Sequence, residues 1–303
     1  MNTFFLDRLN SEPHALAFAG QSTPWPVALA DQSANPALDE ALHTHAAAAQ
    51  ALLYPVSAEL LATTGRPVDL FGFEPNPARL GAAAAASASV PGIALTQLGA
   101  LLDAAALGYN PAQAKPVAVL GHSQGVLAVH MVQAICEAGS IDAAAAKIDE
   151  ILAIATLIGV AGTRQARQLG LAARHGEATP MLSVKDITRA QVDALIERVD
   201  GARGPIAVAV TNSATHYVLS GYPEDLAAFG VEVAKEHKRQ AKLREEKVRG
   251  GRVFDPTLEY LDVTLPFHSP LMADAVSQAV AWAEACGINA DHARELAAEV
   301  LDR

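Results

Sequence analysis

The stretch that decides the fold runs from residue 116 to residue 139 and reads PVAVL, GHSQG, VLAVHMVQAICEAG. A short β-branched run precedes a turn between Gly121 and Gly125, and the helical pattern that follows ends at Gly139. Strand, sharp turn and helix together predict an elbow with Ser123 at its tip, above the amino end of the helix. The pattern indicates a nucleophilic serine. The alternative is a packing turn whose serine caps the helix.

A serine hydroxyl is a weak nucleophile until a base accepts its proton, and that base is usually a histidine. His268 is the candidate, because LPFHSP (265–270) follows a probable strand and its two prolines stiffen the loop. His122 is adjacent to Ser123, so its side chain should diverge from the serine and pack or hydrogen-bond behind it. We therefore expect a Ser123–His268 pair.

The reaction at such a serine also needs donors for an oxyanion. In elbow enzymes one donor is the backbone N–H of the residue after the nucleophile, here Gln124. The other comes from a loop after an early strand, and Gly20-Gln21 follows the apolar run at 14–19. Each donor is worth about 2.7–4 kcal/mol of barrier.

The remaining pattern predicts a core with a smaller insertion. Alanine-dense stretches at 38–64 and 81–107, the latter including the run at 82–86, are typical of helices, and a further helix is expected at about 142–158. From about residue 176 the order is strand, helix, strand, strand, helix, a split βαβ-type unit. We expect a core at 1–175, an inserted subdomain at 176–237, and a return to the core at 238–303.

Composition excludes several classes of function. The formal net charge of −11 argues against nucleic-acid binding. Neither a secretory signal nor a long apolar span is evident, so we expect a cytoplasmic protein that is not a membrane partner. Cys136 and Cys286 lie in apolar, helix-like stretches and are expected to be core thiols. No metal-ligand cluster, phosphate-binding glycine loop or dinucleotide fingerprint is present in the sequence, which predicts no metal and no permanently bound cofactor.

Four motifs in this order resemble the acyl-CoA to acyl-carrier-protein transacylases, including the acyltransferase domains of fatty acid and polyketide synthases: FAGQ (18–21), GHSQG (121–125), VTNSATHYVLSG (210–221) and LPFHSP (265–270). The resemblance implies an α/β-hydrolase-like core with a parallel sheet and an inserted ferredoxin-like α+β subdomain. It also implies a dyad of Ser123 and His268 and oxyanion amides at Gln21 and Gln124. The acyl group would pass from a coenzyme A thioester to the phosphopantetheine of an acyl carrier protein.

The substrate expected from this resemblance is a short neutral acyl group, since GHSQG followed by Val126 looks most like the N-terminal acetyltransferase domain of bacterial and fungal type I fatty acid synthases. Malonyl-handling members carry an arginine after the serine, whereas no arginine lies between Ser123 and Arg164. A buried unpaired carboxylate costs several kcal/mol. Lys147 is the lone cation in that interval. Alternatives are a malonyl or other acyl transferase of the same family, a serine esterase or thioesterase using Asp255 or Asp262, and an idle scaffold segment.

Partners follow from the same resemblance: an acyl carrier protein domain and the other domains of a fatty acid synthase, in a large oligomeric assembly. Only 35 of the 303 residues follow His268, so we expect the chain to continue into further domains. The stretch 235–252 holds eight of the 22 Lys and Arg residues and could attract coenzyme A phosphates or an acidic carrier, or be a solvated helix face. Asn212 either hydrogen-bonds a pantetheine arm or shapes a turn.

Overall fold

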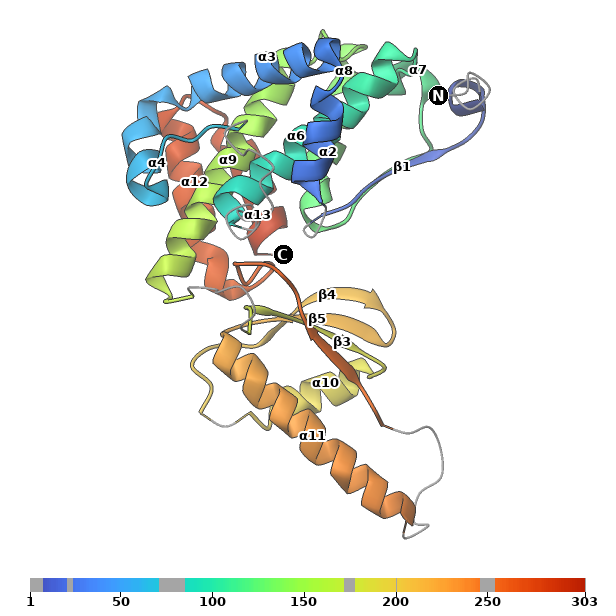
Figure 1. Cartoon of the computed structure of the whole chain (residues 1–303), viewed down its shortest axis with the longest axis vertical. Helices are drawn as coiled ribbons and strands as arrows, with labels where there is room; N and C mark the ends of the chain where they lie inside the picture. Colours follow the sequence, from blue (N-terminus) through green and yellow to red (C-terminus); the bar gives the residue numbers. More distant parts are fainter. Residues whose placement is uncertain are drawn as a thin grey trace. The chain divides into compact units, whose positions relative to one another are not determined.

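The protein is seen here as a computed structural model, which describes residues 8–20, 24–70, 85–171, 178–199, 201–245 and 254–302. The chain forms two compact units, one of residues 1–164 and 275–300 and the other of residues 165–274 and 301–303. Figure 1 shows the elements of both units. The sequence-based boundaries after residues 175 and 237 stay a prediction.

The first unit is mostly helical, and a pair of parallel strands carries its turn-forming motif. β1 (Ala15–Phe18) and β2 (Ala118–Gly121) pair in parallel with Ala15 opposite Ala118 and Phe18 opposite Gly121. Both strands were expected from the sequence. In the described residues, this unit has the helices α2 (Trp25–Ser33), α3 (Pro36–Leu52), α4 (Ser57–Thr64), α6 (Ala86–Ala106), α7 (Pro111–Ala114), α8 (Val126–Ala138), α9 (Ala145–Gln168), α12 (Ala273–Ala285) and α13 (Ala290–Leu301), where α9, α12 and α13 each extend beyond the unit.

Local sequence signals set several of these helix ends. Asn35 caps α3 by accepting a hydrogen bond from the Ala37 N–H, with Pro36 at the first helical position. The expected helix at 38–64 is two helices, because the chain turns through a 3-10 segment at Tyr54–Val56. α8 ends where Gly139 adopts φ +88°, as the sequence predicts.

Aliphatic side chains of α6 and α9 form the buried centre of the first unit. α9 runs longer than the expected 142–158, and its residues 151–161 are all buried. α6 alone among the described helices is long and apolar enough to cross a membrane, but 67% of that stretch is buried inside the protein, as in a core helix. Cys136, expected in the core, is exposed on α8 instead, because the apolar face of this helix is formed by neighbouring positions such as Met131 and Ile135.

In its described residues, the second unit has a four-stranded antiparallel sheet and the two helices that pack on it. Its elements are β3 (Met181–Lys185), α10 (Arg189–Ile196), β4 (Ala207–Ser213), β5 (His216–Ser220), α11 (Pro223–Glu245) and β6 (Thr257–Tyr260). The strand order is β4-β5-β3-β6, which is the ferredoxin-like arrangement of a split βαβ pair. Thr188 and Gln191 form a capping box that begins α10.

One face of this sheet packs against α10 and α11. Alternate residues Leu182 and Val184 of β3, and Tyr217 and Leu219 of β5, contact a core that includes Phe229 of α11, whose side chain is fully buried. β6 completes the sheet by pairing with β3, although it lies beyond the expected subdomain end at residue 237. α11 likewise continues past residue 237 without a break.

Candidate active site

The predicted elbow is formed as strand, turn and helix. The His122 N–H continues the pairing of β2 by donating to the Phe18 carbonyl (2.9 Å), and the Gly125 N–H then donates to the His122 carbonyl (3.0 Å). Between them, Ser123 adopts φ +53°, a left-handed conformation that is strained for any side chain with a Cβ. α8 begins directly after this turn.

Few of the described residues share the positive φ of Ser123. Among the described non-glycine residues, only Lys115, Ser123, Asp186 and His268 have positive φ, so both members of the predicted dyad are in this group. Such conformations cost of order 1–3 kcal/mol each and gather at functional sites, where the surrounding structure enforces them. The positive φ of Ser123 is the conformation expected of an elbow, and the catalytic role of the serine stays a prediction.

Close backbone packing explains two glycines beside this serine. A Cβ on Gly20 would lie 2.5 Å from the His122 carbonyl oxygen and 3.0 Å from the Ser123 Cβ, so only glycine fits there. A Cβ on Gly125 would collide with the Phe18 carbonyl. The end of β1 thus lies directly against the elbow, where a second oxyanion donor was expected. Gln21 itself lies outside the described residues.

A buried glutamine of α6 holds this segment in place. Gln97 Nε2 donates a 2.6 Å hydrogen bond to the carbonyl of Ala19, the residue before Gly20. Gln97 is 8% exposed, and its Oε1 is buried without a hydrogen-bond partner among the described residues. Sequence reasoning missed this residue, because nothing in the helical pattern of α6 distinguishes it from an ordinary polar position.

The side chain of Gln124 has a structural role distinct from that of its backbone. Its Nε2 donates to the carbonyls of Ser89 (3.3 Å) and Val90 (2.5 Å) in α6, and the residue is fully buried. This anchor fixes the peptide that follows Ser123, whose N–H is the predicted oxyanion donor. His122, in contrast, is exposed.

His268 lies in the second unit, in a loop that hydrogen bonds hold on the C-terminal side of this residue. It adopts φ +54° and is only 8% exposed. The next residue, Ser269, donates its N–H to the Leu301 carbonyl (3.2 Å), and its Oγ caps the 3-10 turn at Pro270–Met272. Gln165 Nε2 donates to the Leu271 carbonyl (3.1 Å). Ser123 lies in the first unit, and the pairing of the two residues stays a prediction.

Asn212 lies in strand β4, at an irregularity where Thr211 pairs with Tyr217 and Ser213 with His216. An extra residue of this kind bends a strand and redirects its side chain. Asn212 Nδ2 lies 3.4 Å from His216 Nε2, which in turn lies 3.0 Å from the Oγ of the buried Ser183. His216 thus joins three strands through polar contacts.

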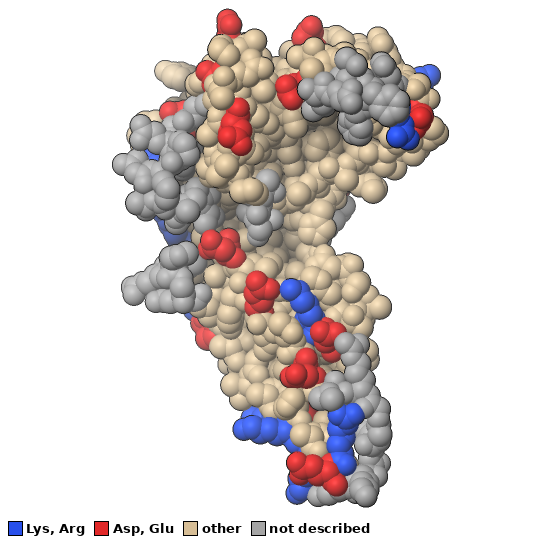
Figure 2. All heavy atoms as spheres, turned by 45° about the vertical axis from the view of Figure 1, so that its right-hand side comes forward, with Lys and Arg blue, Asp and Glu red and all other residues tan. Residues whose placement is uncertain are grey.

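Two other sequence candidates have local partners. Asp255, considered as the acid of a hydrolase triad, lies 3.4 Å from His237 Nδ1. Within the basic stretch, Lys235 pairs with Glu232 and Arg239 with Glu236, which is typical of a solvated helix face. Figure 2 shows blue and red side chains intermixed along this helix, α11. Residues 246–253 lie outside the described part.

The two cations considered as partners for a malonyl carboxylate, Arg164 and Lys147, both contact neighbouring side chains. Arg164 Nη1 donates to Gln278 Oε1 (2.9 Å), and its guanidinium lies 5.9 Å from the ring centre of Trp282. Lys147 Nζ lies 2.7 Å from Glu150 Oε1. Each cation therefore has a partner within the protein.

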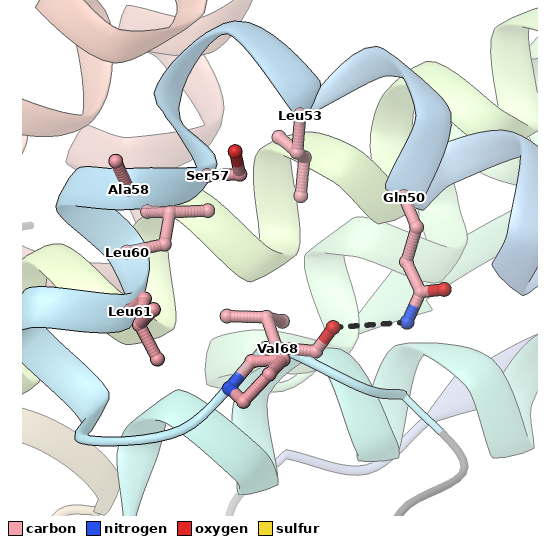
Figure 3. A pocket seen from close by; sticks show the side chains of 8 residues that line it. Gln50, Leu53, Ser57, Ala58, Leu60, Leu61 and Val68 are labelled. Atoms are coloured by element: carbon pink, nitrogen blue, oxygen red, sulfur yellow. Dashed lines mark hydrogen bonds between the residues drawn. The ribbon is translucent and has the colours of Figure 1, made fainter.

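A separate cavity of about 410 Å³ lies in the first unit between the end of α3, α4 and residues 67–68. Leu53, Leu60, Leu61 and Val68 make it apolar, and Gln50 Nε2 donates to the Val68 carbonyl across it (3.1 Å), as Figure 3 shows. None of the predicted site residues lines this cavity.

Comparison with known proteins agrees with this architecture. Residues 180–260 match the family "Fatty acid synthase central AT domain". The beta subunit of fatty acid synthase from Schizosaccharomyces pombe is 27% identical over 209 residues, which make up 62% of this chain and 10% of that subunit. The chain spans a tenth or less of the length of the curated relatives it matches.

Two solved structures are similar over nearly the whole chain. MCAT from Mycobacterium tuberculosis has a TM-score of 0.57 at 19% identity, covering 96% of this chain and 82% of that one. A malonyl-transacylase solved in complex with a type II polyketide synthase acyl-carrier protein has a TM-score of 0.54 at 17% identity, with 96% and 82% covered. The α/β fold predicted from the sequence, a parallel sheet with a small antiparallel subdomain, is confirmed, and so is the resemblance of this chain to the acyltransferases of fatty acid synthases.

Proposed function

We propose that this protein is an acyltransferase that moves a short neutral acyl group, acetyl above all, from coenzyme A to the phosphopantetheine of an acyl carrier protein. The observation that carries the proposal is the strained Ser123, with φ +53°, in an elbow between β2 and α8. A serine held in this way projects its hydroxyl clear of the backbone, as a nucleophile requires.

The proposed reaction has two halves. His268 removes the Ser123 proton as the hydroxyl attacks the acyl-CoA thioester, and the amides of Gln21 and Gln124 bind the oxyanion. Coenzyme A leaves as the thiol after protonation by His268, and an acyl-serine ester remains. The carrier thiol then attacks this ester, with His268 again as base, and free Ser123 is restored. Neither half requires a permanently bound cofactor.

The preference for a neutral acyl group rests on charge. A malonyl carboxylate buried without a cation costs several kcal/mol, or orders of magnitude in rate. Lys147 already pairs with Glu150, and Arg164 with Gln278 and Trp282. We therefore propose discrimination against malonyl-CoA, although the solved structures of similar fold include malonyl-transacylases.

The carrier partner is proposed on similar grounds. A malonyl-transacylase of the same fold has been solved with an acyl-carrier protein, and the curated relatives are fatty acid synthase subunits. We propose that this chain works beside other fatty acid synthase domains in an oligomeric assembly, in the cytoplasm.

Acyl-enzyme trapping tests the proposal. The chain is mixed with radiolabelled acetyl-CoA or malonyl-CoA, quenched in acid, and the label on protein is counted for wild type, Ser123→Ala and His268→Ala. We expect rapid acetyl labelling of wild type and none of Ser123→Ala. Equal labelling of both would refute the serine mechanism. Efficient malonyl labelling would overturn the acyl preference alone.

The rival function, hydrolysis of the ester by water, is separated by the lifetime of the trapped species. A transferase holds its acyl-serine until a carrier thiol or pantetheine is added, whereas a hydrolase loses it in buffer alone. The contact of Asp255 with His237 gives the hydrolase reading less support.

A further inference from the structure

A histidine and two glutamates gather on the first unit, outside the elbow and its supports. His130 belongs to α8, and Glu295 and Glu299 belong to α13. The two glutamates are four residues apart on one helix, so they share a face. One potential ligand atom from each of the three side chains lies within 4.8 Å of those of the other two.

The distance between the donor atoms of His130 and Glu299 matches that between two ligands of one metal ion. His130 Nε2 and Glu299 Oε2 are 3.4 Å apart. For zinc bonds of about 2.0–2.2 Å, two donors of a tetrahedral site lie about 3.3–3.6 Å apart. Glu295 is the exposed member, so its side chain has the freedom to close the remaining gap.

A second observation concerns the same carboxylate. The Glu299 side chain is 31% exposed, but its Oε2 is buried and makes no hydrogen bond among the described residues; its neighbour there is His130 Nε2, at 3.4 Å. Buried carboxylate oxygens are nearly always satisfied by a donor or a bound ion. His130 is half-buried beside it, without a hydrogen bond to that oxygen.

The surrounding charges favour a cation here. A second imidazole, His292, lies with its ring centre 5.6 Å from that of His130, and its Nδ1 is 3.0 Å from Glu150 Oε1. Of the nearby positive charges, Lys147 pairs with the same Glu150 carboxylate, and Arg294 precedes Glu295 on α13. The carboxylates of Glu150, Glu295 and Glu299 outnumber these two cations.

We propose that His130, Glu295 and Glu299 bind a divalent transition-metal ion of the zinc class, with water completing the coordination. One imidazole with two carboxylates suits such an ion, whereas Mg²⁺ and Ca²⁺ prefer all-oxygen sites. The bound ion would hold α13 against α8, the helix that follows Ser123. Sequence spacing gave no sign of this site, because its ligands come from helices far apart in the chain.

The experiment measures ZnCl2 binding to the full 303-residue chain by calorimetry, together with the thermal unfolding midpoint at rising Zn²⁺. We expect one ion per chain, and a midpoint that rises with zinc concentration. Glu299→Gln, which keeps the side-chain shape, and His130→Gln should each weaken binding by about tenfold or more. MgCl2 should give no comparable binding.

A matched control is His43→Ala, because His43 forms an exposed pair with Asp39 one helical turn away on α3, at 3.6 Å. This variant should bind zinc as the wild type does. Co²⁺ offers a second readout, a visible absorption band that Glu299→Gln loses. Absence of zinc binding by wild type would overturn the proposal. So would equal affinity of wild type, Glu299→Gln and His130→Gln, which would leave His130 and Glu299 as an ordinary ion pair.

Discussion

Gly20 and Ser123 are in direct contact: a Cβ added to Gly20 would lie 3.0 Å from the Cβ of Ser123. Gly20→Ala should therefore push the end of β1 away from the elbow. A displacement of about 1 Å in a catalytic site can cost about 10²-fold in rate, and we expect a loss of that size in acyl-enzyme formation. Gly230→Ala is the control, because its nearest contact would be an ordinary 3.6 Å approach to Leu258. Wild-type kinetics in Gly20→Ala would refute this role for the contact.

Gln97 should matter to catalysis without approaching the serine. Gln97→Leu removes the donor to the Ala19 carbonyl, a loss of about 1–3 kcal/mol, and frees the segment that precedes Gln21. We expect acylation to slow by about tenfold or more, as measured by rapid-quench labelling. Gln133→Leu removes only an exposed contact to Glu137 and should leave the rate unchanged. If both variants acylate like wild type, the anchor is dispensable.

The backbone strain at Ser123 predicts an unusual order of stabilities. A left-handed conformation costs about 1–2 kcal/mol for a residue with a Cβ, and glycine avoids this. Ser123→Gly should therefore exceed Ser123→Ala in free energy of unfolding by about 1 kcal/mol, measured in urea, while neither forms acyl-enzyme. At Ser277, inside α12, the order should reverse, because glycine is the poorer helix former. If the alanine variant is the more stable one at position 123 as well, the backbone of Ser123 is unstrained.

Glu236 should make the second unit sensitive to acid. Hydrogen bonds from Arg239 first, and then from Gln240 and Arg198, lower the pKa of Glu236 to about 2. Because the folded pKa lies below the unfolded value of about 4.3, the stabilisation is complete above that value and is lost as pH falls toward 2. Its arginine partners are half-exposed, so we expect about 1–2 kcal/mol.

Urea unfolding at about pH 6 and about pH 3 measures this contribution. Wild type should lose more stability between the two conditions than Glu236→Gln does. Glu259→Gln, at an exposed pair with Lys185, should behave as wild type. Parallel losses in wild type and Glu236→Gln would contradict the assignment.

The elements nearest Ser123 could be predicted because their signals are local. The β-branched run before Gly121, the paired glycines and the stop at Gly139 each act over a few residues, and the structure has β2, the turn and α8 where they were expected. The strained φ of Ser123 follows from the same motif.

Contacts between distant segments could not be read in this way. These contacts depend on which helices and strands become neighbours. Examples are the hydrogen bond from Gln97 to Ala19, the burial of the Gln124 side chain against α6, and the pairing of β6 with β3. The periodicity of a single sequence does not show which segments are neighbours in space. The prediction that Cys136 lies in the core was wrong for a related reason, since an apolar run does not reveal which side of a helix faces the core.

The chain enters and leaves the ferredoxin-like sheet at neighbouring positions. Leu182 pairs with Tyr260, and the Leu261 N–H donates to the Met181 carbonyl (3.0 Å). The start of β3, the first strand of the sheet in the sequence, therefore lies beside the end of β6, the last. A segment whose two ends meet can be grafted into a host loop with little loss of chain-closure entropy. This subdomain is thus suited to insertion into, or removal from, a host domain as one unit, because it has its own hydrophobic core.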